Sequence, residues 1–155
     1  MKLSILSVTV LSACLGGCAQ LGGSTGAPQV VSAQTAQRLQ QRGWNLEGMT
    51  IEGRQIVMDV DATMTVRFES TGQVGGVAGV NRYTGTYSLS AEGRLSWGSP
   101  AFATTRRAGP PELMEKERAY LDALRKVEVA ILDGATLLLQ SDDASTVLSF
   151  RETGR

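Results

Sequence analysis

The stretch from Gly72 to Tyr87, which reads G-Q-V-G-G-V-A-G-V-N-R-Y-T-G-T-Y, constrains the fold more than any other part of the sequence. Glycine tolerates positive φ and close approach of two backbones, so its clustering here indicates tight turns, bulges or a packed crossing. From Tyr83 to Leu89 the residues alternate between two faces, which is the period of a strand with one buried side. We interpret the stretch as a strand, a glycine-rich corner and a second strand.

Short alternating segments continue along the rest of the chain. We expect strands at residues 44–46, 54–60, 63–68, 82–90, 94–97, 101–105, 127–131, 136–140 and 146–151, with a break at 98–100. Residues 112–126 predict the main helix, because apolar residues recur at i, i+3 and i+4 after Pro110-Pro111 and before Arg125-Lys126. A short helix is expected at 33–41. About eight short, largely antiparallel strands with one main helix make an α+β fold.

Composition excludes several classes of function. The chain has no histidine, which removes Ser-His-Asp and Cys-His nucleophiles and the commonest zinc ligand. Its 15 basic and 15 acidic residues balance, and no basic stripe is interleaved with aromatic residues. We therefore expect no catalytic site, metal, cofactor or nucleic-acid partner.

The N-terminus resembles a bacterial lipoprotein leader. Lys2 is followed by an uncharged, mostly apolar run at residues 3–13, too short to span a bilayer but suited to a signal peptide. The sequences L-S-A-C and L-G-G-C end at Cys14 and Cys18, and both resemble a lipobox. An ordinary secretory signal with incidental cysteines is the alternative.

Between the two cysteines we favour Cys18 as the lipidated residue, because it gives the commoner leader length and is followed by the small Ala19. Acyl chains on this cysteine would anchor the chain to a membrane. A residue other than Asp after the cysteine favours the outer membrane, by analogy with enterobacterial sorting. The predicted organisation is a signal peptide at 1–17, the lipidated cysteine with a flexible tether (20–31) and a short helix at 18–42, and a folded domain at 43–152.

Several residue pairs carry both a functional and a structural interpretation. Asp59 and Asp61 share one strand face and could ligate a cation, but such residues more often face solvent beside a turn. Arg106-Arg107 could bind an anionic headgroup, although a solvated loop is the more common explanation. We interpret Asp142-Asp143 as a turn. The glycine run lacks the G-K-[ST] ending of a phosphate-binding loop, so packing is the better explanation.

Aromatic residues offer a second alternative. Tyr83, Tyr87 and Trp97 each lie on an apolar alternating face and are most simply core residues. They could instead line a concave pocket for an apolar ligand such as an acyl chain. Asn81 is expected to hold the corner through hydrogen bonds from its side chain to the backbone.

The glycine run also resembles the signature of the META/HslJ-like domain, roughly G-x-x-G-C-N-x-[YF]-x-G-x-Y. The matching residues are Gly76, Gly79, Asn81, Tyr83, Gly85 and Tyr87. The opening tryptophan of the family matches Trp44, and its Thr-rich stretch before a helix matches 104–110, including Thr105. Val80 and Gly109 stand where many relatives carry cysteine, so whatever that pair does elsewhere, such as forming a disulfide, is dispensed with here.

The resemblance implies a curved sheet or partial barrel with the helix packed against it. Relatives of the HslJ type are associated with heat-shock and antibiotic-tolerance phenotypes, and the resemblance implies no more about function than this association. We therefore expect a lipid-anchored outer-membrane protein whose domain faces the periplasm and contacts other envelope proteins. The alternative is a carrier or sensor that binds a lipid or another small apolar molecule inside the half-barrel.

Overall fold

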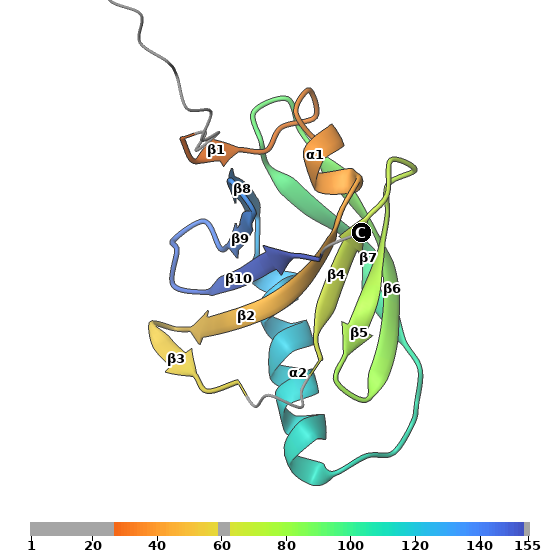
Figure 1. Ribbon diagram of the computed structural model, residues 1–155. Helices are drawn as coiled ribbons and strands as arrows, with labels where there is room; N and C mark the ends of the chain where they lie inside the picture. The colour runs from red at the N-terminus through yellow and green to blue at the C-terminus, as the bar shows by residue number, and fades with distance from the viewer. Residues whose placement is uncertain (1–26, 59–62, 154–155) are drawn as a thin grey trace, which may run out of the picture.

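A computed structural model describes residues 27–58 and 63–153 of the chain, and Figure 1 shows its arrangement. One antiparallel sheet of ten strands has the order β1-β8-β9-β10-β2-β4-β5-β6-β7, with β3 paired to β2. The strands are β1 (Gln29–Val30), β2 (Gly43–Ile51), β3 (Arg54–Ile56), β4 (Thr65–Phe68), β5 (Gln73–Ala78), β6 (Asn81–Leu89), β7 (Leu95–Thr104), β8 (Val129–Asp133), β9 (Thr136–Gln140) and β10 (Val147–Glu152). The helices are α1 (Gln37–Gln40) and α2 (Pro111–Lys126). The predicted α+β class is confirmed.

The sheet coils around α2 without closing into a barrel (Figure 1). The helix lies between the two halves of the sheet, one formed by β1, β8, β9, β10 and β2 and the other by β4, β5, β6 and β7. The two halves meet where β7 begins and α2 ends. There the amide of Leu95 donates to the carbonyl of Glu128 at 2.7 Å, and the indole of Trp97 donates to the carbonyl of Val127 at 3.0 Å. Beyond Trp97, β7 pairs with no strand of the described residues other than β6 and forms an edge of the sheet.

Helix α2 follows the pattern expected from its sequence. Pro111 stands in its first turn and Arg125 and Lys126 in its last, which suits the fixed φ of proline and the helix dipole. Its inward stripe buries Tyr120, Leu121, Ala123, Leu124 and, unusually, the carboxylate residue Glu117. The prediction of this helix is confirmed to within one residue.

The concave face of the sheet and α2 share one core. Met64, Val66 and Phe68 are fully buried, as their alternation predicts, and the largest other buried side chains are Trp44, Tyr83, Tyr120, Phe150, Leu39 and Met49. At about 25 cal/mol per Å² of apolar surface, such side chains contribute most of the favourable free energy of folding. Both halves of the sheet supply them, so the halves fold as one unit.

Two expectations about the strands are corrected. Gly75 and Gly76 lie inside β5, so the glycine-rich corner is only the turn at Gly79 and Val80. The break at 98–100 does not separate two strands, because residues on both sides pair with β6: Trp97 opposes Tyr87 and Phe102 opposes Gly85. Four residues of β7 therefore face the single Thr86, and the ladder continues around this bulge.

The N-terminal segment joins the sheet earlier than expected. Residues 29 and 30, which we assign to the tether from sequence, pair with β8, and Val31 is 1% exposed. Gly93, in the turn between β6 and β7, packs against this segment: a Cβ there would lie 2.5 Å from Cγ1 of Val30. The expected helix at 33–41 is reduced to α1, whose Leu39 is fully buried.

Candidate functional site

Asn81, at the start of β6, is the centre of a buried polar cluster. Its side-chain amide donates to Oε1 of Glu117 at 2.8 Å and to the carbonyl of Arg107 at 3.3 Å. Its carbonyl oxygen accepts from Oγ1 of Thr105 and from the amide of Arg107, both at 2.8 Å. Its own amide donates to Oε2 of Glu117 at 2.9 Å. Every group of the asparagine side chain is therefore used to hold β6, α2 and the loop before α2 together.

A second buried cluster surrounds the carbonyl of Thr65, on β4. The hydroxyl of Tyr83 donates to this carbonyl at 2.8 Å, and the hydroxyl of Tyr120 lies 2.9 Å from that of Tyr83. The hydroxyl oxygen of Thr65 accepts a hydrogen bond from the backbone amide of Val77 at 3.0 Å, in place of a backbone hydrogen bond between the two strands. Gly76 allows this arrangement, because a Cβ at that position would lie 2.0 Å from the Thr65 carbonyl oxygen.

The aromatic residues proposed as pocket-lining pack against other rings. Tyr83 meets Phe102 edge-to-face with centroids 5.3 Å apart, Tyr87 meets Phe68 at 4.9 Å, and Trp97 meets Phe102 at 5.1 Å. The hydroxyl of Tyr87 donates to the carbonyl of Glu69 and accepts from Nε2 of Gln40, both at 2.9 Å. The structure thus brings all three residues into one ring cluster.

Burial changes the acidity of the three tyrosines. Desolvation raises the pKa of Tyr83 and of Tyr120 far above the ordinary value, and the neighbouring hydroxyl only partly offsets this for Tyr83. Desolvation also raises the pKa of Tyr87, which its hydrogen bond to Gln40 lowers in part. The hydroxyls therefore act as neutral hydrogen-bonding groups at physiological pH.

The remaining motif residues also bond to the backbone or allow its conformation and close packing. The indole of Trp44 donates to the carbonyl of Leu39 at 3.1 Å, and Gly79 has a φ of 83° in the turn between β5 and β6. A Cβ at Gly85 would lie 2.2 Å from the carbonyl oxygen of Ala101, next to the bulge in β7. Thr105 accepts from the amide of Arg82 at 3.1 Å while it donates to Asn81. All eight motif residues thus have a structural role.

Val80 and Gly109 are neighbours in space. A Cβ at Gly109 would lie 2.5 Å from Cγ2 and 3.3 Å from Cβ of Val80. In this chain the valine side chain occupies the volume that the glycine leaves free. The two positions where relatives carry cysteine are therefore joined here by an apolar contact.

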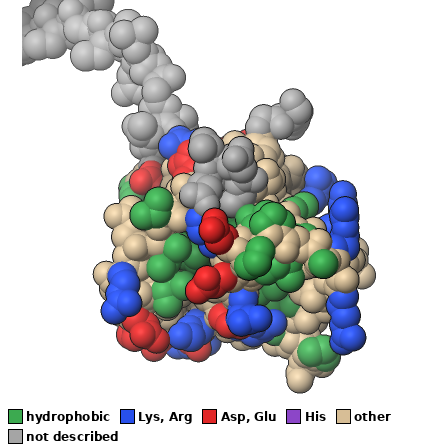
Figure 2. All heavy atoms as spheres, turned by 90° about the horizontal axis from the view of Figure 1, so that it is seen from below, with side chains coloured by type: hydrophobic (Ala, Val, Ile, Leu, Met, Phe, Trp, Pro, Cys, Tyr) green, Lys and Arg blue, Asp and Glu red, His purple; other side chains and the backbone are tan. Residues whose placement is uncertain are grey.

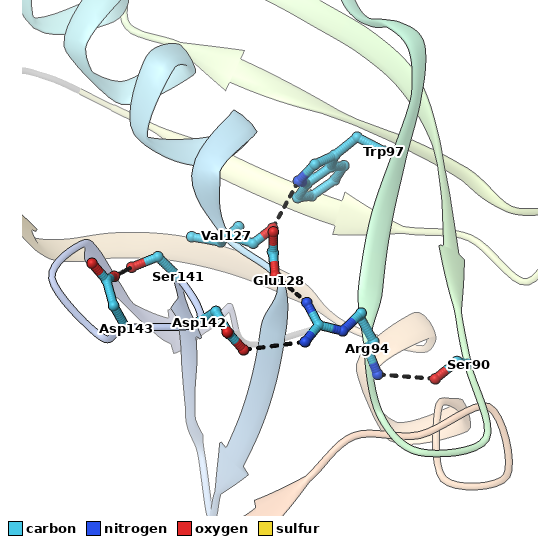
Figure 3. A network of polar contacts seen from close by, with 8 residues as sticks. All are labelled: Ser90, Arg94, Trp97, Val127, Glu128, Ser141, Asp142 and Asp143. Carbon is cyan, nitrogen blue, oxygen red and sulfur yellow. Dashed lines mark hydrogen bonds and ion pairs between the residues drawn. The ribbon is translucent and has the colours of Figure 1, made fainter.

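The junction between the two halves of the sheet carries a surface ion network (Figure 3). The guanidinium of Arg94 lies between the carboxylates of Glu128 and Asp142, with its Nη2 3.2 Å from Oδ1 of Asp142. In the adjacent turn, Asp143 accepts from Oγ of Ser141 at 2.6 Å and from the amide of Ser145 at 3.0 Å. These bonds lower the pKa of Asp143 to about 2, and they confirm that Asp142-Asp143 forms a turn.

Other predicted residues divide between the surface and the undescribed parts of the chain. Arg106 and Arg107 lie in the exposed loop before α2. Cys14, Cys18, Asp59 and Asp61 lie outside the described residues. Within the described ranges, no three His, Cys, Asp or Glu side chains gather as a metal site would require. In that same part of the chain, every buried side-chain nitrogen and oxygen has a hydrogen-bond partner.

Sequence reasoning missed two adjoining hollows on the outer face of β4, β5 and β6. One has a volume of about 320 Å³ and lies between Arg67 and Arg82, and the other, of about 500 Å³, extends to Pro100 and Ala103 on β7. Both have Gly75 in their lining. The period-2 pattern places Arg67, Gly75 and Thr84 on the outer face, but only the strand register makes them neighbours.

A family model identifies the family of the chain, and solved structures share its fold. The META domain family model matches residues 37–154. A solution structure of a protein from Burkholderia xenovorans is 27% identical, with a TM-score of 0.65, covering 87% of this chain and 97% of its own. A second solution structure is 23% identical, with a TM-score of 0.54, covering 76% of this chain and 93% of its own.

A crystal structure of a DUF4847 family protein from Bacteroides vulgatus shares the fold at 12% identity. Its TM-score is 0.56, and the alignment covers 77% of this chain and 98% of that protein. No curated protein matches the chain significantly. Among the described residues, no helix has the length and apolar character needed to cross a bilayer.

Proposed function

The chain belongs to the META domain family, and we propose that it acts as a lipid-anchored outer-membrane protein whose domain faces the periplasm. The observation that carries this proposal is the leader, in which an apolar run ends at two lipobox-like cysteines shortly before the fold begins. Acylation of Cys18, or alternatively of Cys14, would supply the membrane anchor that the described helices do not provide.

The distance from anchor to fold is short. Eight residues lie between position 18 and position 27, where the described structure begins, and nine fully extended residue-to-residue steps span about 32 Å at most. The chain enters the fold at β1, so this end of the domain would face the bilayer. The opposite end, with the first turn of α2, would face the periplasm (Figure 1).

We further propose that the domain supports envelope integrity or stress tolerance through contacts with other envelope proteins and without catalysis. In support, the motif residues hold the backbone, and the buried polar groups among the described residues bond one another. A partner protein could contact the edge of the sheet that β7 forms beyond Trp97. Figure 2 shows that the underside carries apolar side chains interspersed with charges of both signs.

A complementation experiment tests this proposal. A strain lacking the gene is expected to admit more hydrophobic dye through its outer membrane after heat shock, and the wild-type gene should restore the barrier. Cys14→Ala/Cys18→Ala should fold but fail to restore it, since the unanchored domain would no longer stay at the membrane. Full restoration by this variant would contradict a role that depends on anchoring.

The alternative, binding of a lipid or another apolar ligand, would require the ring cluster to open. Tyr87 is 8% exposed and Tyr83 1% exposed, and both are held by hydrogen bonds to the backbone of β4 and the residue after it. Native mass spectrometry with an envelope lipid extract distinguishes the two functions. A lipid adduct that disappears in Trp97→Ala or Tyr87→Ala would favour the carrier function.

A further inference from the structure

The outer face of β4, β5 and β6 carries a groove with a glycine, Gly75, in the lining of both of its hollows. Strand register places Arg67 opposite Gly75 and Gly75 opposite Thr84, so a glycine separates two longer residues on one face. A Cβ at Gly75 would lie 3.0 Å from the carbonyl oxygen of Tyr83, which leaves little room for a larger residue. The groove thus follows from the same close backbone packing that builds the fold.

One end of the groove is basic. Arg67 from β4 and Arg82 from β6 are both exposed and line the hollow of about 320 Å³ from either side of β5. Neither guanidinium has an ion pair with any described residue, although Glu69 lines the same hollow. Two guanidinium groups that face one space suit an oxyanion with several acceptor oxygens, because each can donate two parallel hydrogen bonds.

The lining of the other end includes no basic residue and is rich in hydrogen-bonding groups. The hollow of about 500 Å³ shares Glu69, Gly75 and Thr84 with the basic end and adds Gln73 and Thr86. The side chains of Gln73, Thr84 and Thr86 make no hydrogen bond with the described residues. Amides and hydroxyls of this kind pair with the hydroxyl groups of a polyol, and the carboxylate of Glu69 can accept from one of them.

We propose that this groove binds a phosphorylated polyol, with the phosphoryl group between Arg67 and Arg82 and the hydroxyl-bearing part over Thr84, Thr86 and Gln73. Glu69 disfavours a second negative charge, so the ligand carries its charge at one end only. Such a group occurs on soluble sugar and glycerol phosphates and in the headgroups of some lipids. The chemistry recognised is the same in both cases.

The test follows the arginine Nε–H signals of the mature chain by NMR in a non-ionic polyoxyethylene detergent. Glycerol 3-phosphate should shift the signals of Arg67 and Arg82, and inorganic phosphate should shift them with lower affinity. Arg67→Gln or Arg82→Gln should weaken binding of both probes about tenfold. Arg54→Gln is the matched control, because Arg54 is an exposed arginine without a described ion pair on β3, outside the groove.

Substitutions at the end without arginine separate the two parts of the site. Thr86→Val should weaken binding of glycerol 3-phosphate severalfold and leave binding of inorganic phosphate unchanged, because Thr86 lines only the hollow without arginine. Competition by phosphatidylglycerol vesicles, with phosphatidylcholine vesicles as control, would identify a lipid headgroup, and the absence of competition would identify a soluble ligand. Unshifted Arg67 and Arg82 signals at millimolar probe, or an equal loss in Arg54→Gln, would overturn the proposal.

Discussion

Asn81 and Glu117 are 36 positions apart in sequence, yet two hydrogen bonds of 2.9 and 2.8 Å join them in the interior. Both bonds end on one carboxylate, which accepts the backbone amide at one oxygen and the side-chain amide at the other. Glu117 therefore fixes the start of β6 against α2. This contact explains why an asparagine follows the turn at Gly79, and why a helix stripe of otherwise apolar residues includes a glutamate.

Replacing Asn81 by Ala should destabilise the fold by about 3 kcal/mol, because it leaves the buried carboxylate without its side-chain donor and Thr105 without its acceptor. Chemical denaturation measures the change. Asn45→Ala is the matched control, since Asn45 is an exposed asparagine on β2 and should change stability by less than about 0.5 kcal/mol. Equal effects of the two substitutions would contradict the role of the cluster.

The glycines of β5 and β6 should tolerate no side chain. Gly76→Ala places a methyl group 2.0 Å from the carbonyl oxygen of Thr65, so we expect a loss of about 3 kcal/mol or failure to fold. Gly48→Ala, on β2, meets nothing within 4 Å and should be neutral or slightly stabilising. Thermal unfolding of both variants distinguishes close backbone packing from a general intolerance of alanine in strands.

Cysteines at positions 80 and 109 should form a disulfide in this chain. Cβ atoms at these positions would lie 3.3 Å apart, close to the range that a disulfide requires. Oxidised Val80→Cys/Gly109→Cys is expected to gain about 3 kcal/mol over its reduced form, because the bond closes a loop of moderate length. Non-reducing electrophoresis with mass spectrometry detects the bond, and persistently free thiols would contradict the proximity of the two positions.

No tyrosine of the chain should ionise independently near pH 10. Burial raises the pKa of all three above the ordinary value of a tyrosine hydroxyl. Above that pH the folded chain binds more protons than the unfolded chain, so stability that is fully present below pH 10 is lost as the pH rises through the folded-state pKa values. Tyrosinate absorbance should rise together with unfolding. A separate early transition would contradict the burial of at least one hydroxyl.

Local patterns were sufficient to predict α2 and the strands with one buried face. In α2 the apolar spacing, the prolines and the terminal basic residues all indicate the same helix. At residues 63–68, the alternation of Met64, Val66 and Phe68 indicates a strand with these three side chains buried. The break at 98–100 misled the strand assignment, because Gly and Pro signal an interruption but do not show that both sides pair with β6.

The clusters depend on contacts that sequence spacing does not encode. The hydroxyl of Tyr120 meets that of Tyr83 across 37 positions, and the Thr65 carbonyl reaches both only because Gly76 has no side chain. The groove between Arg67 and Arg82 likewise requires the register of three strands. The resemblance to a family named these positions, and the contacts in the structure supply a physical reason for each.

The intact mass of the chain purified from membranes tests the central proposal most directly. We expect a polypeptide that begins at Cys18 and carries the mass of three acyl chains, and we expect Cys18→Ala to lose palmitate labelling. A lipidated chain that begins at Cys14 would move the anchor without removing it. A chain without acyl groups, released in soluble form from the periplasm, would contradict the account of this protein as a lipid-anchored member of its family.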